Sequence, residues 1–375
     1  MPSSLKHRWS VSHNYLAGIT AGDWWRLLRE NRFAVDPVYW HRGAFVTLLS
    51  LVNSYHRRKE ENEFNERIAA TPIQKAPLFI IGHWRSGTTH LHNLLAQDDA
   101  SFAYANTYQV VNPHTFLRTE EVNTRRFAWM IPKTRPMDNM ALSFDSPQED
   151  EFAPLLVTLL SSYLGVSFPR REDHYTRYLT FAGVPRAEIE TWKTGFEWFL
   201  KKLTLKYGGD RALLLKSPPH TARIRLLLEL FPGAKFVHIH RRPEEVFQSF
   251  RHYYDTAMWH TYLQRPDRSR IDDEIIERYR TLMGAYFAER DLIPPGHFHE
   301  VAFADLEREP VATVAGIYKA LSIEGTDQAL PKIRAYADTL GGYEKNRFQP
   351  LTGPEKQRLR EAWSSIYERL GYRID

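Results

Sequence analysis

Residues 82–89, Gly-His-Trp-Arg-Ser-Gly-Thr-Thr, are the part of this chain that most constrains its fold. They follow a short apolar run, Leu78 to Ile81, that begins after Pro77, and they precede a segment with helical spacing. A buried strand, a glycine-containing loop and a helix in this order are typical of a phosphate-binding loop in a parallel sheet. Glycine lets the backbone approach an anion closely, and the start of the helix adds a positive partial charge. The sequence therefore predicts an anion site at 82–89.

Three later apolar segments predict further strands, each followed or preceded by helical spacing: 212–216, 233–240 and 297–303. Strands that alternate with helices indicate an α/β fold, a parallel sheet of the phosphate-loop type with helices on its faces. Residues 1–75 have an amphipathic helical pattern and predict an N-terminal helical extension, so we expect the α/β domain to occupy 76–375. In the C-terminal part, 352–370 predicts a capped helix.

The composition narrows the functional classes. The 375 residues include no cysteine, which excludes disulfides, thiolate metal sites and cysteine nucleophiles. A net charge of +5 is small for a nucleic-acid-binding protein, so no nucleic acid is expected as a partner. The charge fits an anionic small ligand and leaves room for peripheral membrane contact. The N-terminus lacks the apolar core of a signal peptide, and we expect a cytoplasmic protein. The sequence makes no prediction of an oligomeric state.

Two other segments carry local expectations. The apolar run 154–168 is shorter than a membrane span and predicts a buried core helix. The run 56–67 mixes charges of both signs and predicts a solvated helix face.

The loop differs from that of a nucleoside triphosphatase. Thr88 stands where such a loop has its lysine, and a cation is found instead at Arg85. No strand ending in a Mg²⁺-binding aspartate is evident. The loop therefore predicts a shorter anion and no metal. Two other functions remain open for a chain with such a loop. One is that of a Mg-ATP-dependent enzyme of the kinase type, and the other is that of a non-catalytic nucleotide-binding adaptor.

The segment Phe-Ile-Ile-Gly-His-Trp-Arg-Ser-Gly-Thr-Thr resembles the 5′-phosphosulfate loop of the sulfotransferases that use 3′-phosphoadenosine 5′-phosphosulfate (PAPS). The bacterial branch and the tyrosylprotein sulfotransferases share Arg-Ser-Gly-Thr-Thr. The resemblance implies transfer of a sulfuryl group from PAPS to a hydroxyl group on a small or lipid-like acceptor. It also implies that the loop residues hold the 5′ end of the donor: Arg85, Ser86, Gly87, Thr88 and Thr89.

A second segment, 235–249, resembles the 3′-phosphate motif of this family. In that motif an Arg after a strand is followed eight residues later by a Ser, which here selects Arg241 and Ser249 over Arg242. An arginine fork and a hydroxyl can converge on one phosphate dianion. A third segment, 343–348, resembles the segment that closes over this phosphate. It places Lys345 and Asn346 at the donor.

The catalytic residues are less constrained. Lys216 matches a family lysine near the sulfuryl group, whereas His220 is displaced by two residues from the family's histidine base. Tyrosylprotein sulfotransferases have a glutamate about twenty residues after the loop arginine, and 104–110 of this chain has no carboxylate there. Glu149 and then Glu151 precede His220 as candidates for the general base.

A purely structural interpretation of the acids at 149–151 remains open. Ser146 as the N-cap, Pro147 at the first helical position and Glu149 three residues after the cap would form a capping box. Residues 100–200 and the N-terminal helices are rich in aromatic and apolar residues, and we expect them to form a lipophilic acceptor pocket.

Overall fold

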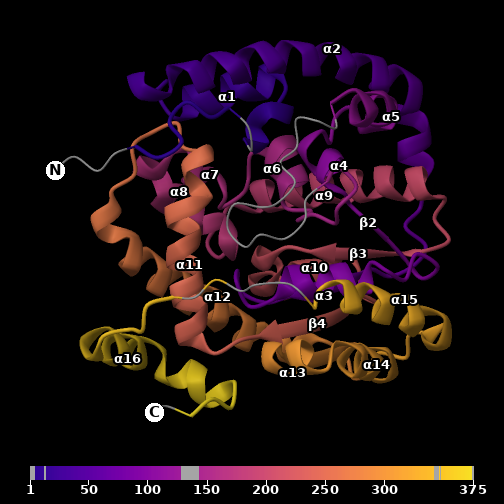
Figure 1. The fold of residues 1–375 in the computed structure, drawn as a ribbon. Coiled ribbons are helices and arrows are strands. Elements are labelled where there is room, and N and C mark those ends of the chain that lie inside the picture. Colours follow the sequence, from indigo (N-terminus) through magenta and orange to yellow (C-terminus); the bar gives the residue numbers. More distant parts are fainter. Residues whose placement is uncertain (1–4, 12–13, 128–142, 342–345, 347, 374–375) are drawn as a thin grey trace. The chain divides into compact units, whose positions relative to one another are not determined.

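A computed structural model describes residues 5–11, 14–127, 143–341, 346 and 348–373, and these residues form two compact units (Figure 1). The first unit comprises 1–73, 105–208 and 253–268, and the second comprises 74–104, 209–252 and 269–375. The N-terminal helical stretch therefore lies in one unit with 105–208. None of the helices that the structure describes is long and apolar enough to cross a membrane.

The second unit is built on a sheet of five parallel strands in the order β2-β3-β1-β4-β5. The strands are β1 (Leu78–Ile81), β2 (Phe102–Tyr104), β3 (Ala212–Lys216), β4 (Lys235–His240) and β5 (Phe298–Ala302). Four of them confirm the predicted strands. β2 was not predicted, because three residues are too few to establish a periodic pattern.

Side chains on the two faces of the sheet bury different helices. Leu78 and Ile80 of β1 face a core formed by α3 (Thr88–Leu95), α13 (Phe303–Arg308), α14 (Pro310–Ala320) and α15 (Thr326–Thr339). Phe79 lies between them in sequence and points to the other face, where its ring stacks on that of Phe236 at 5.4 Å. The remaining elements of this unit are η6 (Pro218–Ala222), α10 (Ile224–Leu230), α12 (Ile271–Glu289), η9 (Arg290–Leu292), α16 (Gly353–Arg369) and α11 (Pro243–Thr256) up to His252. The sheet with helices on both faces confirms the predicted α/β fold.

Predicted helix signals in this unit are confirmed. Pro243 opens α11, with Glu244 and Glu245 in its first turn, where carboxylates favour the helix dipole. Thr352 caps α16, accepting a hydrogen bond from the backbone N–H of Glu355.

The first unit is helical. Its elements are η1 (Tyr15–Gly18), α1 (Ala21–Glu30), η2 (Pro37–Tyr39), α2 (Trp40–Ala70), α4 (Thr107–Val111), α5 (Phe116–Phe127), α6 (Phe152–Thr158), α7 (Leu164–Ser167), η4 (Pro169–Arg171), α8 (Glu172–Thr176), η5 (Arg177–Leu179), α9 (Arg186–Tyr207) and η7 (Met258–His260), with η8 (Arg268–Arg270) at its end. The helices α1 and α2 confirm the predicted helical N-terminus.

The predicted single helix over 154–168 is wrong in its continuity, although the segment is largely buried. It forms α6 and α7, separated by 159–163, and this break begins at Leu159, whose φ of 65° is left-handed. Thr158 Oγ1 accepts a hydrogen bond from Leu160 N at 3.1 Å, and Ser161 Oγ accepts one from Tyr163 N at 3.3 Å. Such hydroxyl-to-backbone bonds replace the helical ladder.

The predicted capping box at 146–149 is also wrong, because α6 begins only at Phe152. Ser146 Oγ accepts a hydrogen bond from Ser143 N, and its carbonyl accepts one from Thr107 N. Pro147 forms an antiparallel bridge with Asn106. The turn at 143–146 and the pairing with Asn106 and Thr107 override the local helix signal.

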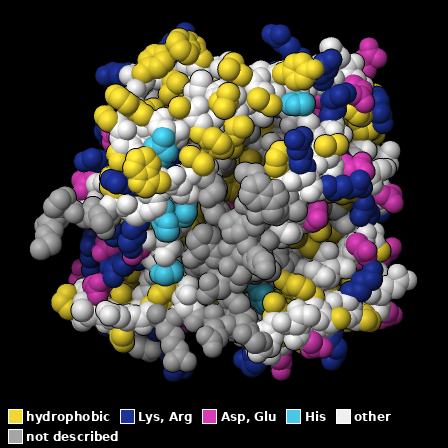
Figure 2. Space-filling model, turned by 45° about the horizontal axis from the view of Figure 1, so that its top comes forward, with side chains coloured by type: hydrophobic (Ala, Val, Ile, Leu, Met, Phe, Trp, Pro, Cys, Tyr) yellow, Lys and Arg dark blue, Asp and Glu magenta, His cyan; other side chains and the backbone are white. Residues whose placement is uncertain are grey.

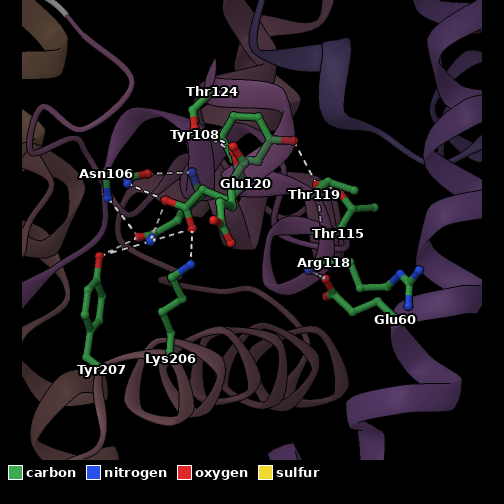
Figure 3. A network of polar contacts seen from close by, with 12 residues as sticks. Glu60, Asn106, Tyr108, Thr115, Arg118, Thr119, Glu120, Thr124, Lys206 and Tyr207 are labelled. Carbon is green, nitrogen blue, oxygen red and sulfur yellow. Dashed lines mark hydrogen bonds and ion pairs between the residues drawn. The ribbon is translucent and has the colours of Figure 1, made fainter. Parts of the chain in front are cut away.

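The run 56–67 is not a purely solvated face, because Glu60 is buried. Its carboxylate pairs with Lys202 Nζ of α9 and accepts a hydrogen bond from Arg118 N at 3.1 Å. A neighbouring polar network centres on Glu120 (Figure 3), whose carboxylate accepts hydrogen bonds from Asn106 Nδ2 at 2.6 Å and pairs with Lys206 Nζ at 2.8 Å. Both buried carboxylates join helices that are far apart in the sequence.

Candidate functional site

The candidate site lies in the second unit, where three adjacent parallel strands end. β1 is flanked by β3 on one side and β4 on the other, so the strand order changes direction at β1. The register pairs Ile80 with Lys216 and Ile81 with His238. The loop 82–87, Lys216 and Arg241 therefore all lie at the carboxyl edge of the sheet. Ligands of open α/β sheets bind at this kind of position.

The loop after β1 is held by contacts within the unit. The Gly82 N–H donates to Thr221 Oγ1 at 2.7 Å, and Ser86 Oγ donates to the carbonyl of His83 at 2.7 Å. A Cβ atom on Gly82 would lie 2.3 Å from the carbonyl oxygen of Ile239, so only glycine fits there. The Ser86 side chain thus closes the loop.

Gly87 is required for two reasons. Its φ of 103° is left-handed, and a Cβ atom there would lie 2.2 Å from Phe303 Cδ2 of α13. The helix α3 starts at the next residue, Thr88, which is buried, and the first N–H groups of a helix have no partner inside it. The loop geometry therefore presents backbone donors at the start of α3, as an anion site needs.

Arg85 stands on the crown of the loop with a left-handed φ of 70°. A non-glycine residue in this region carries strain of about 1 kcal/mol or more, and such strain is concentrated at functional sites. Its Nε donates to Ser249 Oγ of α11 at 3.0 Å. The two sequence motifs, 82–89 and 235–249, are thus in direct contact.

Lys216 lies at the end of β3 and is almost fully buried. Its Nζ donates to Thr89 Oγ1 of α3 at 3.3 Å. The structure therefore brings Lys216 to the helix that follows the loop.

Arg241 follows β4. Its Nε donates to Glu245 Oε2 at 2.6 Å, and its guanidinium lies 4.8 Å from the ring centre of Phe303. The next residue, Arg242, pairs with Glu244 and donates to the carbonyl of Arg373 at the C-terminal end of the chain. Phe303 is therefore shared by Gly87 and Arg241, whereas Arg242 is directed to other partners.

Two histidines lie beside these residues. His83 is buried between the rings of Phe250 and Tyr279, and burial lowers its pKa to about 3, so the ring is neutral at physiological pH. His220 lies in η6 and is fully buried, with its ring 5.4 Å from that of Phe79. Of the two C-terminal candidates, Asn346 is half-buried, and Lys345 is outside the described residues.

The acidic candidates belong to the first unit. Glu149 is half-buried, and Tyr163 donates its hydroxyl to Glu149 Oε2 at 2.5 Å. Burial and this carboxylate raise the pKa of Tyr163 well above its usual value, so the phenol keeps its proton. Glu151 is fully buried and accepts a hydrogen bond from Ser161 Oγ at 2.6 Å. Each carboxylate is thus held by a hydroxyl group from the segment after α6.

Sequence reasoning missed two residues that shape the site. Thr221 and Phe303 lie 139 and 216 residues after the loop residues that they contact, Gly82 and Gly87, so no local pattern could have selected them. The segment 104–110 does have a carboxylate beside it, that of Glu120, which is already engaged by Asn106, Gln109 and Lys206.

Comparisons with known proteins agree with this geometry. A family model described as "Sulfotransferase family" matches residues 77–327. The Omega-hydroxy-beta-dihydromenaquinone-9 sulfotransferases Stf3 of Mycobacterium bovis and Mycobacterium tuberculosis are each 36% identical to this chain over 355 residues, covering 95% of it and 90% of the relative. The crystal structure of sulfotransferase STF1 from Mycobacterium tuberculosis superposes with a TM-score of 0.65 at 16% identity, over 93% of this chain and 94% of that one. That of STF9 from Mycobacterium avium gives 0.64 at 18% identity, over 94% and 97%. At these identities the likeness of the two solved structures is one of fold.

Proposed function

This chain belongs to the sulfotransferase family, and from this premise we propose that it transfers the sulfuryl group of PAPS to a hydroxyl group on a lipid-like acceptor. The observation that carries the donor assignment is the direct contact between the two motifs. Arg85 of the loop donates to Ser249 of the second motif, and Lys216 donates to Thr89. One anionic ligand with groups at both ends fits this arrangement.

The residues at the sheet edge suit the two ends of PAPS. We assign Gly87, Thr88 and Thr89 with the start of α3 to the 5′-phosphate, because backbone donors and hydroxyl groups gather there. Arg241 and Ser249 are assigned to the 3′-phosphate. Binding there requires the Arg241 guanidinium to exchange Glu245 for the phosphate, a dianion and hence the stronger partner. We also propose that Lys345 and Asn346 belong to a segment that contacts the donor at this end.

The donor, when bound, supplies an activated S–O bond whose cleavage leaves negative charge on the 5′-phosphate. Lys216 at the end of β3 and Arg85 on the loop are the cations proposed to stabilise that charge. Thr88 occupies the position of a triphosphatase lysine, and we propose that the reaction needs no metal.

We propose Glu149 as the general base that accepts the proton of the acceptor hydroxyl. Its carboxylate is half-buried, whereas the Glu151 carboxylate and the His220 ring are fully buried and so less accessible to a substrate. The Tyr163 hydroxyl orients one of its oxygens. A positioned base contributes about 10²–10⁴-fold to a rate.

Replacement of Glu149 by glutamine is therefore expected to lower kcat about 10²–10⁴-fold and to leave binding of the spent donor, adenosine 3′,5′-bisphosphate, unchanged. The matched control is Glu151→Gln, in which the amide oxygen still accepts the Ser161 hydroxyl, and which is expected to stay within a few-fold of wild type. Turnover assays with labelled PAPS measure both. A large loss in Glu151→Gln with none in Glu149→Gln would reverse the assignment.

The acceptor is proposed from the relatives and from the apolar character of the first unit. The two relatives bear a name that specifies a hydroxylated menaquinone, and their similarity extends over 95% of this chain. We propose a hydroxylated, polyprenyl-type lipid as the acceptor class and a cytoplasmic location for the reaction.

The donor assignment is tested by calorimetry with adenosine 3′,5′-bisphosphate in the absence of metal. Arg241→Ala is expected to weaken binding about 10–100-fold, because a charge-assisted contact to a phosphate is worth roughly 1.5–3 kcal/mol. Arg242→Ala is the matched control, since Arg242 contacts Glu244 and Arg373 instead, and is expected to bind within about threefold of wild type. Preferential binding of ATP with Mg²⁺ would contradict the assignment, and bisphosphate binding without turnover would indicate the adaptor.

A further inference from the structure

The outer face of α2 is apolar and exposed. Trp40, Leu48, Leu51, Val52 and Tyr55 are spaced at 0, 8, 11, 12 and 15 residues, which places them in one stripe along the helix. Leu48 is 63% and Tyr55 59% exposed, and all five are among the most exposed large apolar side chains. Figure 2 shows hydrophobic side chains gathered over the part of the surface where α1 and α2 lie in Figure 1. We call these five residues the α2 stripe.

Over the length of the α2 stripe the helix itself has basic but no acidic residues, and Arg57 beside it pairs with Asp23 of α1 and with Glu61. Residues 40–59 include no aspartate or glutamate. At the carboxyl end of the stripe, Lys59 Nζ lies 5.6 Å from the ring centre of Tyr55, and Arg58 is exposed beside it. At the other end the exposed ring of Trp9 lies 5.2 Å from that of His41 and carries the guanidinium of Arg8 at 4.9 Å. An apolar stripe thus has cations at both ends.

We propose that the α2 stripe docks onto the surface of an anionic lipid bilayer, with α2 lying in the plane of the headgroups. Amphipathic helices that bind in this way have tryptophan and leucine on one face and lysine or arginine beside it. The aromatic rings suit the boundary between headgroups and acyl chains, and the cations pair with anionic headgroups.

A lipid surface fits these observations better than a protein partner. A stable protein interface buries on the order of 800 Å² on each side. The stripe is a single line of five side chains on one helix, and the charged residues of α2 within its length are all basic. The proposal rests on the proposed function in one respect, because a polyprenyl acceptor would reside in the same bilayer.

The test is flotation of the full-length protein with vesicles of equal parts phosphatidylglycerol and phosphatidylcholine. The double variant Leu48→Gln/Leu51→Gln is expected to reduce vesicle binding at least about tenfold, because each leucine loses its buried apolar area and glutamine keeps the helix. The matched control is Val122→Gln on α5, a side chain with the same 63% exposure outside the stripe, which is expected to bind like wild type. Vesicles of phosphatidylcholine alone are expected to bind wild type more weakly.

Three outcomes would overturn the proposal. They are failure of the wild type to float, equal flotation of the double variant, and a wild-type dimer in sedimentation that the double variant converts to a monomer while vesicles bind neither. Bisphosphate binding is measured on every sample. This binding reports on the folded donor site independently of vesicle binding, so a failure of the donor assignment can be told from a failure of membrane docking.

Discussion

Replacement of Lys216 by methionine is expected to lower kcat for sulfuryl transfer by about 10²–10³-fold. The ammonium group lies at the carboxyl end of β3 and donates to Thr89 beside the phosphate loop. In the proposed mechanism it acts mainly on charge that develops in the transition state. The KM for PAPS is therefore expected to change far less than kcat. Initial rates at varied PAPS concentration separate the two.

The control uses a lysine of the same sheet at its opposite edge. Lys235 begins β4 and donates to the carbonyl of Leu321. Lys235→Met therefore removes the same kind of charge at the amino end of a strand, away from the loop at the carboxyl edge of the sheet. It is expected to keep kcat within a few-fold of wild type. A loss of less than about tenfold in Lys216→Met would remove Lys216 from the catalytic machinery.

Replacement of Lys202 by methionine is expected to lower the free energy of unfolding by about 3–5 kcal/mol. The Lys202 side chain is fully buried, and its Nζ pairs with Glu60, donates to the carbonyl of Pro113 and lies 4.5 Å from the ring centre of Trp198. Burial lowers the pKa of Lys202 to about 8 and raises that of Glu60, while each partner favours the charged form of the other. Removing the ammonium leaves a buried carboxylate without its counter-ion. Urea denaturation followed by circular dichroism measures the loss.

Two further variants decide whether the pair is the cause. Lys201→Met on the same helix breaks a partly exposed pair with Glu197 and is expected to cost less than about 1 kcal/mol. Lys202→Met combined with Glu60→Leu removes both charges and is expected to recover most of the stability, because replacing a buried pair with apolar groups is often neutral. Equal stability of the single and double variants would contradict the account.

The sequence by itself determined the elements whose signals are local. The run Leu78–Ile81, the glycines at 82 and 87 and the helix from Thr88 are neighbours in the chain, so strand, loop and helix could be predicted from spacing alone. Arg241 and Ser249 are also close in the sequence, because Arg241 directly follows β4 and Ser249 lies in the next helix, α11. The fold class followed from the alternation of such segments.

Tertiary structure alone decided which distant residues meet. The strand order places β3 and β4 beside β1, and only then do Lys216 and Thr89, or Arg85 and Ser249, come within hydrogen-bonding distance. The sequence indicated that these residues belong together only through the family resemblance.

The same distinction explains the predictions that were wrong. A capping-box pattern at 146–149 gave way to pairing with Asn106 and Thr107, some 40 residues earlier. In the charged run 56–67, Glu60 is buried because it pairs with Lys202. That partner lies 142 residues away, so no local pattern could indicate it. Local patterns report on residues within about one or two helical turns, whereas burial and ion pairing depend on which elements the whole chain packs together.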